Sequence, residues 1–119
     1  MMPKPRADIA PNTIEFETLP LVKPTGFREY DARWWFGIPD NPKAPDLNLL
    51  GAEALGLGMA TLFHELGVTP KVVTGHDFRS ISLPIKNALK LGLVASASSC
   101  LHLCTVSLDR LKIIQLVFD

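Results

Sequence analysis

Proline is concentrated in the first part of this 119-residue chain. Five of the ten prolines lie between positions 3 and 24, and three more fall in the segment GIPDNPKAP at residues 37–45. Because proline lacks an N–H and fixes φ at about −65°, neither segment can form a long helix or a central strand. We therefore predict an extended arm over residues 1–25, in which residues 13–16 could add an edge strand, and a turn-rich connector over residues 37–45.

The first helix is predicted directly after the connector, over about residues 47–66. Asp46 is a suitable N-cap, and Gly67 marks the end of the helix. Apolar residues recur at steps of three and four and predict one broad inner face. This face would consist of Leu47, Leu50, Ala54, Leu55, Met59, Leu62, Phe63 and Leu66.

Three glycines lie inside this predicted helix, at positions 51, 56 and 58. Each lowers helix stability by about 1 kcal/mol relative to alanine, so packing rather than propensity must hold the helix. We expect the glycines to allow a close approach of the helix backbone to a sheet.

A strand at residues 71–74 and a second helix at about residues 82–95 follow. Ser82 would be the N-cap of this helix, which places Pro84 in the first turn, where a missing N–H is harmless. Its inner face would consist of Ile85, Ala88, Leu89 and Leu93, with Lys86 and Lys90 outside. Further strands are predicted at residues 101–106 and 113–118. The alternation indicates an α/β fold, with a mixed sheet flanked by helices.

Charge and cysteine content narrow the cellular setting. Twelve basic residues balance twelve acidic ones, and two cysteines are too few for a disulfide framework. The first residues lack the apolar core of a signal peptide. Residues 91–108 carry no full charge but only just reach the length of a membrane span. Their serines and threonine lower the hydrophobicity of the segment. We expect a cytoplasmic protein that binds neither nucleic acid nor membrane.

The stretch 26-GFREYDARWW-35 concentrates charged and aromatic side chains. If it forms one strand, alternation places Phe27, Glu29, Asp31 and Arg33 on one face, so that neither face is purely apolar. Two explanations stay open. The charges could form solvated pairs such as Asp31 with Arg33, worth less than about 1 kcal/mol, or the stretch could line a cleft. Trp34 and Trp35 would then face surface that another domain covers.

The turn 75-GHDFR-79 leaves a predicted strand and enters a helix, a position where α/β proteins bind ligands. His76 could act as an acid or base, and Arg79 could hold a phosphate. In the alternative interpretation, Asp77 satisfies backbone donors of the turn and pairs with Arg79.

Cys100, His102 and Cys104 share one face of a predicted strand and are a conceivable metal-ligand set. The spacing lacks a fourth ligand and differs from the usual C-x-x-C, so small strand residues are the favoured explanation and no metal site is predicted. The chain contains no P-loop, dinucleotide-binding, zinc-protease or hydrolase motif.

The segment FREYDARW resembles the F-R-x-Y-D-I-R-G signature of the α-D-phosphohexomutases, above all the bacterial phosphomannomutase/phosphoglucomutases. ELGVTPKVVTGHDFRSISLPIKNALKLGLVAS resembles the helix, strand, G-x-D-x-R turn and helix that follow in that family. The resemblance covers residues 26 to about 96 in the family's order. It implies that residues 26–119 correspond to an incomplete first domain, with a diverged tail at residues 97–119.

The resemblance also implies an activity. Members of the family are isomerases of carbohydrate metabolism that move phosphate between the 1- and 6-positions of a hexose through a phosphoserine, with Mg²⁺ and a hexose 1,6-bisphosphate activator. By the same resemblance, Tyr30 and Arg33 would contact the phosphoserine and the sugar phosphate. His76, Asp77 and Arg79 would shape the same cleft.

The chain departs from the family in its catalytic parts. Trp34 replaces the signature glycine, and the serine, metal, sugar and phosphate loops are absent from the 119 residues. We therefore expect no turnover by this chain, because it has no nucleophile to carry the phosphoryl group. Two interpretations remain: an inactive N-terminal fragment of a mutase, or a non-catalytic module that binds a sugar phosphate or a protein partner. Self-association through an unpaired sheet edge is also expected.

Overall fold

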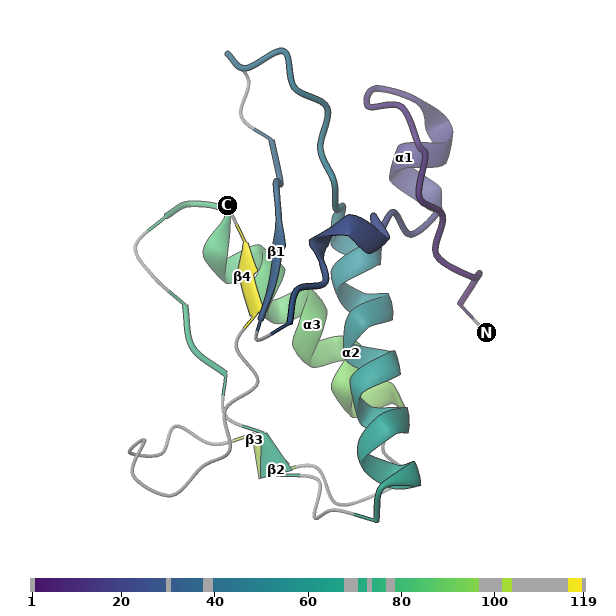
Figure 1. Cartoon of the computed structure of the whole chain (residues 1–119), viewed down its shortest axis with the longest axis vertical. Helices are drawn as coiled ribbons and strands as arrows, with labels where there is room; N and C mark the ends of the chain where they lie inside the picture. Colours follow the sequence, from purple (N-terminus) through teal and green to yellow (C-terminus); the bar gives the residue numbers. More distant parts are fainter. Residues whose placement is uncertain are drawn as a thin grey trace. The chain divides into compact units, whose positions relative to one another are not determined.

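The computed structural model of the chain describes residues 2–29, 31–37, 40–67, 71–72, 74–76, 79–96, 102–103 and 116–118. The chain divides into two compact units, the first formed by Met1–Gly51 with Lys112–Asp119 and the second by Ala52–Leu111. The elements, shown in Figure 1, are α1 (Ile14–Thr18), the 3-10 helix η1 (Pro24–Gly26), β1 (Ala32–Trp34), α2 (Leu49–Glu65), β2 (Lys71–Val72), α3 (Ser82–Ser96), β3 (His102–Leu103) and β4 (Leu116–Phe118).

The described strands form two parallel pairs, one in each unit. In the first unit β1 pairs with β4, with Ala32 opposite Leu116. In the second unit β2 pairs with β3, with Lys71 opposite His102. The described part of the chain thus combines helices with short strands, as expected for an α/β protein. The strands are shorter than expected, and a single mixed sheet stays a prediction.

The N-terminal arm is more structured than its prolines suggest. The edge strand considered at residues 13–16 is wrong, because this segment enters α1. Thr13 caps that helix by accepting a hydrogen bond from the Phe16 N–H at 3.2 Å, and Glu15 and Glu17 lie in the first turn, where the helix dipole favours acids. The cap and the acidic first turn therefore favour a helix where an edge strand was considered.

The arm also belongs to the core of the first unit. The Arg6 N–H donates to the Pro20 carbonyl, and the Val22 N–H donates to the Arg6 carbonyl, both at 2.9 Å. Ile9, Leu21 and Val22 are buried. The arm thus contributes apolar side chains to the unit.

Helix α2 begins later than predicted. Asn48, not Asp46, is its N-cap: the Asn48 side-chain oxygen accepts the Gly51 N–H at 2.7 Å. The predicted end is confirmed, because Gly67 adopts a positive φ of 67° and its N–H donates to the His64 carbonyl at 3.1 Å.

The buried face of α2 also differs from the prediction. The residues that the second unit buries there are small, namely Ala52, Gly56 and Ala60, whereas Leu66 of the predicted inner face is 64% exposed. The nearest neighbours of a side chain added at Gly56 would be backbone atoms of α3, and a side chain added at Gly92 of α3 would meet the backbone of α2. The glycine therefore allows two helices, rather than a helix and a sheet, to approach closely.

Helix α3 agrees with its prediction over almost its whole length. It begins at Ser82 itself, one residue before the expected first turn, and Pro84 lies in that turn. All four residues predicted for its inner face are buried, namely Ile85, Ala88, Leu89 and Leu93. No helix in the described residues is long and apolar enough to cross a membrane.

Candidate functional site

The stretch around β1 is a reversal of the chain rather than one continuous strand. Phe27 and Ala32 form an antiparallel bridge, and the Arg28 N–H donates to the Asp31 carbonyl at 2.9 Å. The predicted strand alternation from Phe27 to Arg33 is therefore wrong. Among the described residues of the stretch, only Ala32–Trp34 forms a strand, and it buries Ala32 and Trp34 while leaving Arg33 exposed.

Trp34 holds this strand in the core of the first unit. It is only 1% exposed, and its indole N–H donates to the Lys23 carbonyl at 2.8 Å. The ring of Phe27 meets it edge to face, with centroids 5.1 Å apart, and Gly26 lies directly against the indole. The expectation that Trp34 faces surface covered by another domain is therefore wrong, since residues 23–27 of the same chain cover it.

Trp35 is partly covered by the connector at residues 37–45. Its indole N–H donates to the Lys43 carbonyl at 3.2 Å, and the Lys43 ammonium lies 5.7 Å from the ring centroid. Asp46 accepts from the Trp35 backbone N–H at 3.3 Å and pairs with Lys23 at 3.4 Å. These contacts fasten the connector to the end of β1.

Arg33 carries the exposed positive charge of β1. Its Nε lies 3.1 Å from the Asp31 carboxylate, and its side chain is 53% exposed. The predicted pair is thus confirmed. Within the residues that the structure describes, this contact leaves both terminal guanidinium nitrogens without a partner, so they can bind an anion in two-pronged fashion. Tyr30, the other residue predicted here, lies outside the described residues.

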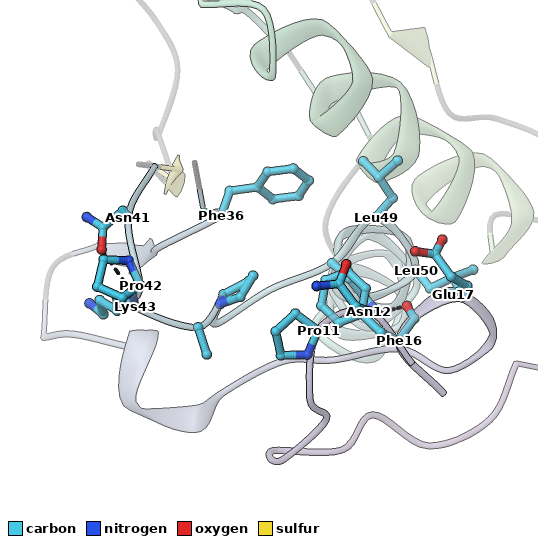
Figure 2. A pocket seen from close by; sticks show the side chains of 14 residues that line it. Pro11, Asn12, Phe16, Glu17, Phe36, Asn41, Pro42, Lys43, Leu49 and Leu50 are labelled. Atoms are coloured by element: carbon cyan, nitrogen blue, oxygen red, sulfur yellow. Dashed lines mark hydrogen bonds between the residues drawn. The ribbon is translucent and has the colours of Figure 1, made fainter. Parts of the chain in front are cut away.

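An open groove of about 730 Å³ lies in the first unit and is drawn in Figure 2. In Figure 2, Phe36, Asn41, Pro42 and Lys43 lie on one side of the groove, and Phe16, Leu49 and Leu50 lie on the other. The groove is lined by Pro11, Asn12, Phe16, Glu17, Phe36, Gly37, Asn41, Pro42, Lys43, Ala44, Pro45, Asn48, Leu49 and Leu50. Arg33, the described site residue of this unit, does not line it.

The predicted turn 75-GHDFR-79 belongs to the second unit, whereas Arg33 belongs to the first, so the cleft that they were predicted to share stays a prediction. The Lys86 ammonium contacts Nδ1 of His76 at 3.3 Å. Arg79 is exposed, and its carbonyl accepts the Ser82 N–H at 3.0 Å at the start of α3. Asp77 lies outside the described residues, so its predicted pairing with Arg79 stays a prediction.

Among the residues whose placement is described, no three His, Cys, Asp and Glu side chains gather in one place. Cys100 and Cys104 of the conceivable ligand set lie outside that part of the chain.

Comparisons of the chain with protein-family models, with curated proteins and with solved structures found no match. The phosphohexomutase resemblance therefore depends on the two motifs alone.

Two features of the structure were missed by sequence reasoning. Asp46 and Asn48 are both good capping types, and only the contacts of Asn48 show which one caps α2. The contact between His76 and Lys86 joins residues ten positions apart, in a loop and a helix. No local pattern predicts such a pair.

Proposed function

We propose that this chain binds hexose phosphates without interconverting them, as the first part of a phosphohexomutase-type domain with a mixed sheet. The observation that supports the proposal most directly is the exposed guanidinium of Arg33, held through Nε by Asp31. The resemblance of FREYDARW to the family signature assigns the same residue to the sugar phosphate.

The local structure of β1 suits this role. Burial of Ala32 and Trp34 fixes the strand, so that Arg33 between them projects from a firmly held backbone. A positioned arginine loses less side-chain freedom on binding and matches two phosphate oxygens at once. Tyr30 is proposed as the second contact, through its hydroxyl.

Catalysis by the chain itself is not part of the proposal. The 119 residues contain no serine loop of the T-x-S-H-N type, and without a nucleophile no phosphoryl group is carried. Mg²⁺ and the bisphosphate activator belong with that loop, and no residue of this chain is proposed to hold them.

Titration of the full chain with glucose 6-phosphate and mannose 6-phosphate, followed by backbone NMR shifts, tests the binding. We expect residues around Arg33 to shift in a saturable manner. Arg33→Met should weaken binding about tenfold, because a charged hydrogen bond is lost. Arg28→Met is the matched control, since Arg28 is an exposed arginine of the same stretch. Equal weakening by both variants would reduce the effect to net charge and contradict the proposal.

A coupled mutase assay with glucose 1-phosphate, Mg²⁺ and glucose 1,6-bisphosphate tests the absence of catalysis. Turnover by the purified chain that disappears in Arg33→Met would show that the chain is a catalyst in its own right. That outcome would overturn the non-catalytic half of the proposal.

A module that binds a protein partner is the second candidate. It is favoured by large apolar side chains that the two long helices leave exposed in the second unit. These are Leu62 of α2, Leu66 directly after the end of α2, and Leu83, Leu91 and Val94 of α3. If neither sugar phosphate changes the backbone NMR shifts around Arg33, partner binding becomes the preferred function.

A further inference from the structure

Two basic side chains touch each other in the second unit. The Lys86 ammonium on α3 lies 3.3 Å from Nδ1 of His76, in the segment that follows β2. An ammonium group can only donate, so Nδ1 of His76 must accept. With Nδ1 as the acceptor, the ring carries a hydrogen on Nε2. The contact thus selects one tautomer of His76.

The pair presents donors and positive charge together. Lys86 keeps two further N–H groups, and His76 offers Nε2–H. Neither Lys86 nor His76 forms an ion pair with a carboxylate of the described residues. A ligand that suits this arrangement must be an anion with several acceptor oxygens.

The pair is also accessible. His76 is exposed and Lys86 is half-buried, so their donors can reach a ligand in solvent. An exposed contact between two bases contributes little to stability by itself, because water competes for both groups. Its donors are therefore better explained by a ligand than by a structural role.

We infer that His76 and Lys86 form a phosphate-binding site in the second unit. The ligand class is a phosphate group, either free or as a monoester, whose oxygens accept from Nε2–H of His76 and from the Lys86 ammonium. This site does not depend on the proposed function of Arg33, which belongs to the other unit.

The test is a titration of the ¹⁵N-histidine-labelled full chain with inorganic phosphate, glucose 6-phosphate and chloride at equal ionic strength. We expect saturable shifts of the His76 ring nitrogens with both phosphates and none with chloride. Similar affinities for the two phosphates would assign the site to the phosphate group, and tighter binding of glucose 6-phosphate would assign it to a sugar phosphate.

Variants distinguish the site from general electrostatic attraction. Lys86→Met should weaken phosphate binding about tenfold. Lys90→Met is the matched control, because Lys90 is exposed on the same helix, and it should change the affinity less than about twofold. Arg33→Met should leave the His76 shifts unchanged, so that failure of either proposal is seen separately.

The inference would be overturned by a wild-type chain whose His76 signals do not move with phosphate, by equal shifts with chloride, or by equal weakening in Lys86→Met and Lys90→Met. Both lysine variants change surface positions of α3, and equal helical circular dichroism of the two would exclude misfolding as the cause.

Discussion

Asn48 links the N-terminal arm to the start of α2 through a single buried amide. Asn48 is only 4% exposed. The side-chain oxygen accepts the N–H groups of Leu21 and Gly51, at 2.8 and 2.7 Å. The side-chain nitrogen donates to the carbonyls of Phe16 and Leu19, also at 2.8 and 2.7 Å. All the hydrogen-bonding groups of the amide are therefore used inside the first unit.

Asn48→Ala should lower the free energy of unfolding by about 3 kcal/mol, because it removes a helix cap and leaves buried backbone groups without partners. Urea denaturation followed by circular dichroism measures the change. Asn87→Ala, at an exposed position of α3, is the control and should change the value by less than about 0.5 kcal/mol. If both variants lose equal stability, Asn48 has no special structural role.

The burial of Trp34 depends on residues that directly precede β1. From the sequence, aromatic side chains beside charged ones predict a surface that another domain covers. In the structure Trp34 is enclosed by Phe27, Gly26 and the Lys23 carbonyl, all contributed by residues before the strand. The reversal between Phe27 and Ala32 brings these groups together, and a strand pattern cannot predict such a reversal.

At the scale of elements, the close packing of α2 and α3 depends on glycine. Backbone atoms of α3 lie where a side chain at Gly56 would be, whereas nothing lies within 4 Å of such a position at Gly58. The two glycines lie in the same helix and differ only in what surrounds them.

Gly56→Ala should therefore lower the free energy of unfolding by about 2 kcal/mol, since the added methyl group forces the helices apart. Gly58→Ala should raise it by about 1 kcal/mol, because alanine has the higher helix propensity and meets no neighbour. Thermal and urea unfolding of the two variants measure these opposite changes. A stabilising effect at both positions would show that the helices do not pack closely.

The predictability of the two long helices differs for the same reason. All four predicted inner residues of α3 are buried, because Lys86 and Lys90 mark its outer side, although the helix also exposes Leu83, Leu91 and Val94. Helix α2 is apolar over much of its surface, so periodicity could not choose between its large and its small residues. The neighbouring helix selected the small ones.

At the scale of the whole molecule, self-association is the property that the exposed apolar side chains of the second unit favour. Leu66 and Leu91 are 64% and 62% exposed, and Val94 is half-exposed. Among the described residues, neither of the two strand pairs has a third strand beside it. Exposed apolar side chains and unpaired strand edges both favour association. We expect the chain to self-associate.

Sedimentation velocity over a range of concentrations tests this expectation, and the average sedimentation coefficient should rise with concentration. Leu91→Glu should weaken association about tenfold, because an apolar side chain no longer becomes buried. Asn87→Glu introduces the same charge on the exposed surface of α3 and is the control. A wild-type chain that stays monomeric at all concentrations would contradict the expectation.

The sequence by itself determined those features that depend on neighbours within one or two turns. Gly67 ends α2, Pro84 lies in the first turn of α3, and the described residues of the connector before α2 form no helix. Each follows from the backbone dihedrals and hydrogen-bonding capacity of a few adjacent residues.

The tertiary structure decided what depends on distant partners: the choice of Asn48 over Asp46 as cap, the buried small-residue face of α2, the enclosure of Trp34 and the contact of His76 with Lys86. Several residues were suitable for each role. Only the approach of segments far apart in the chain selected one, because burial and hydrogen-bond satisfaction are properties of the assembled unit.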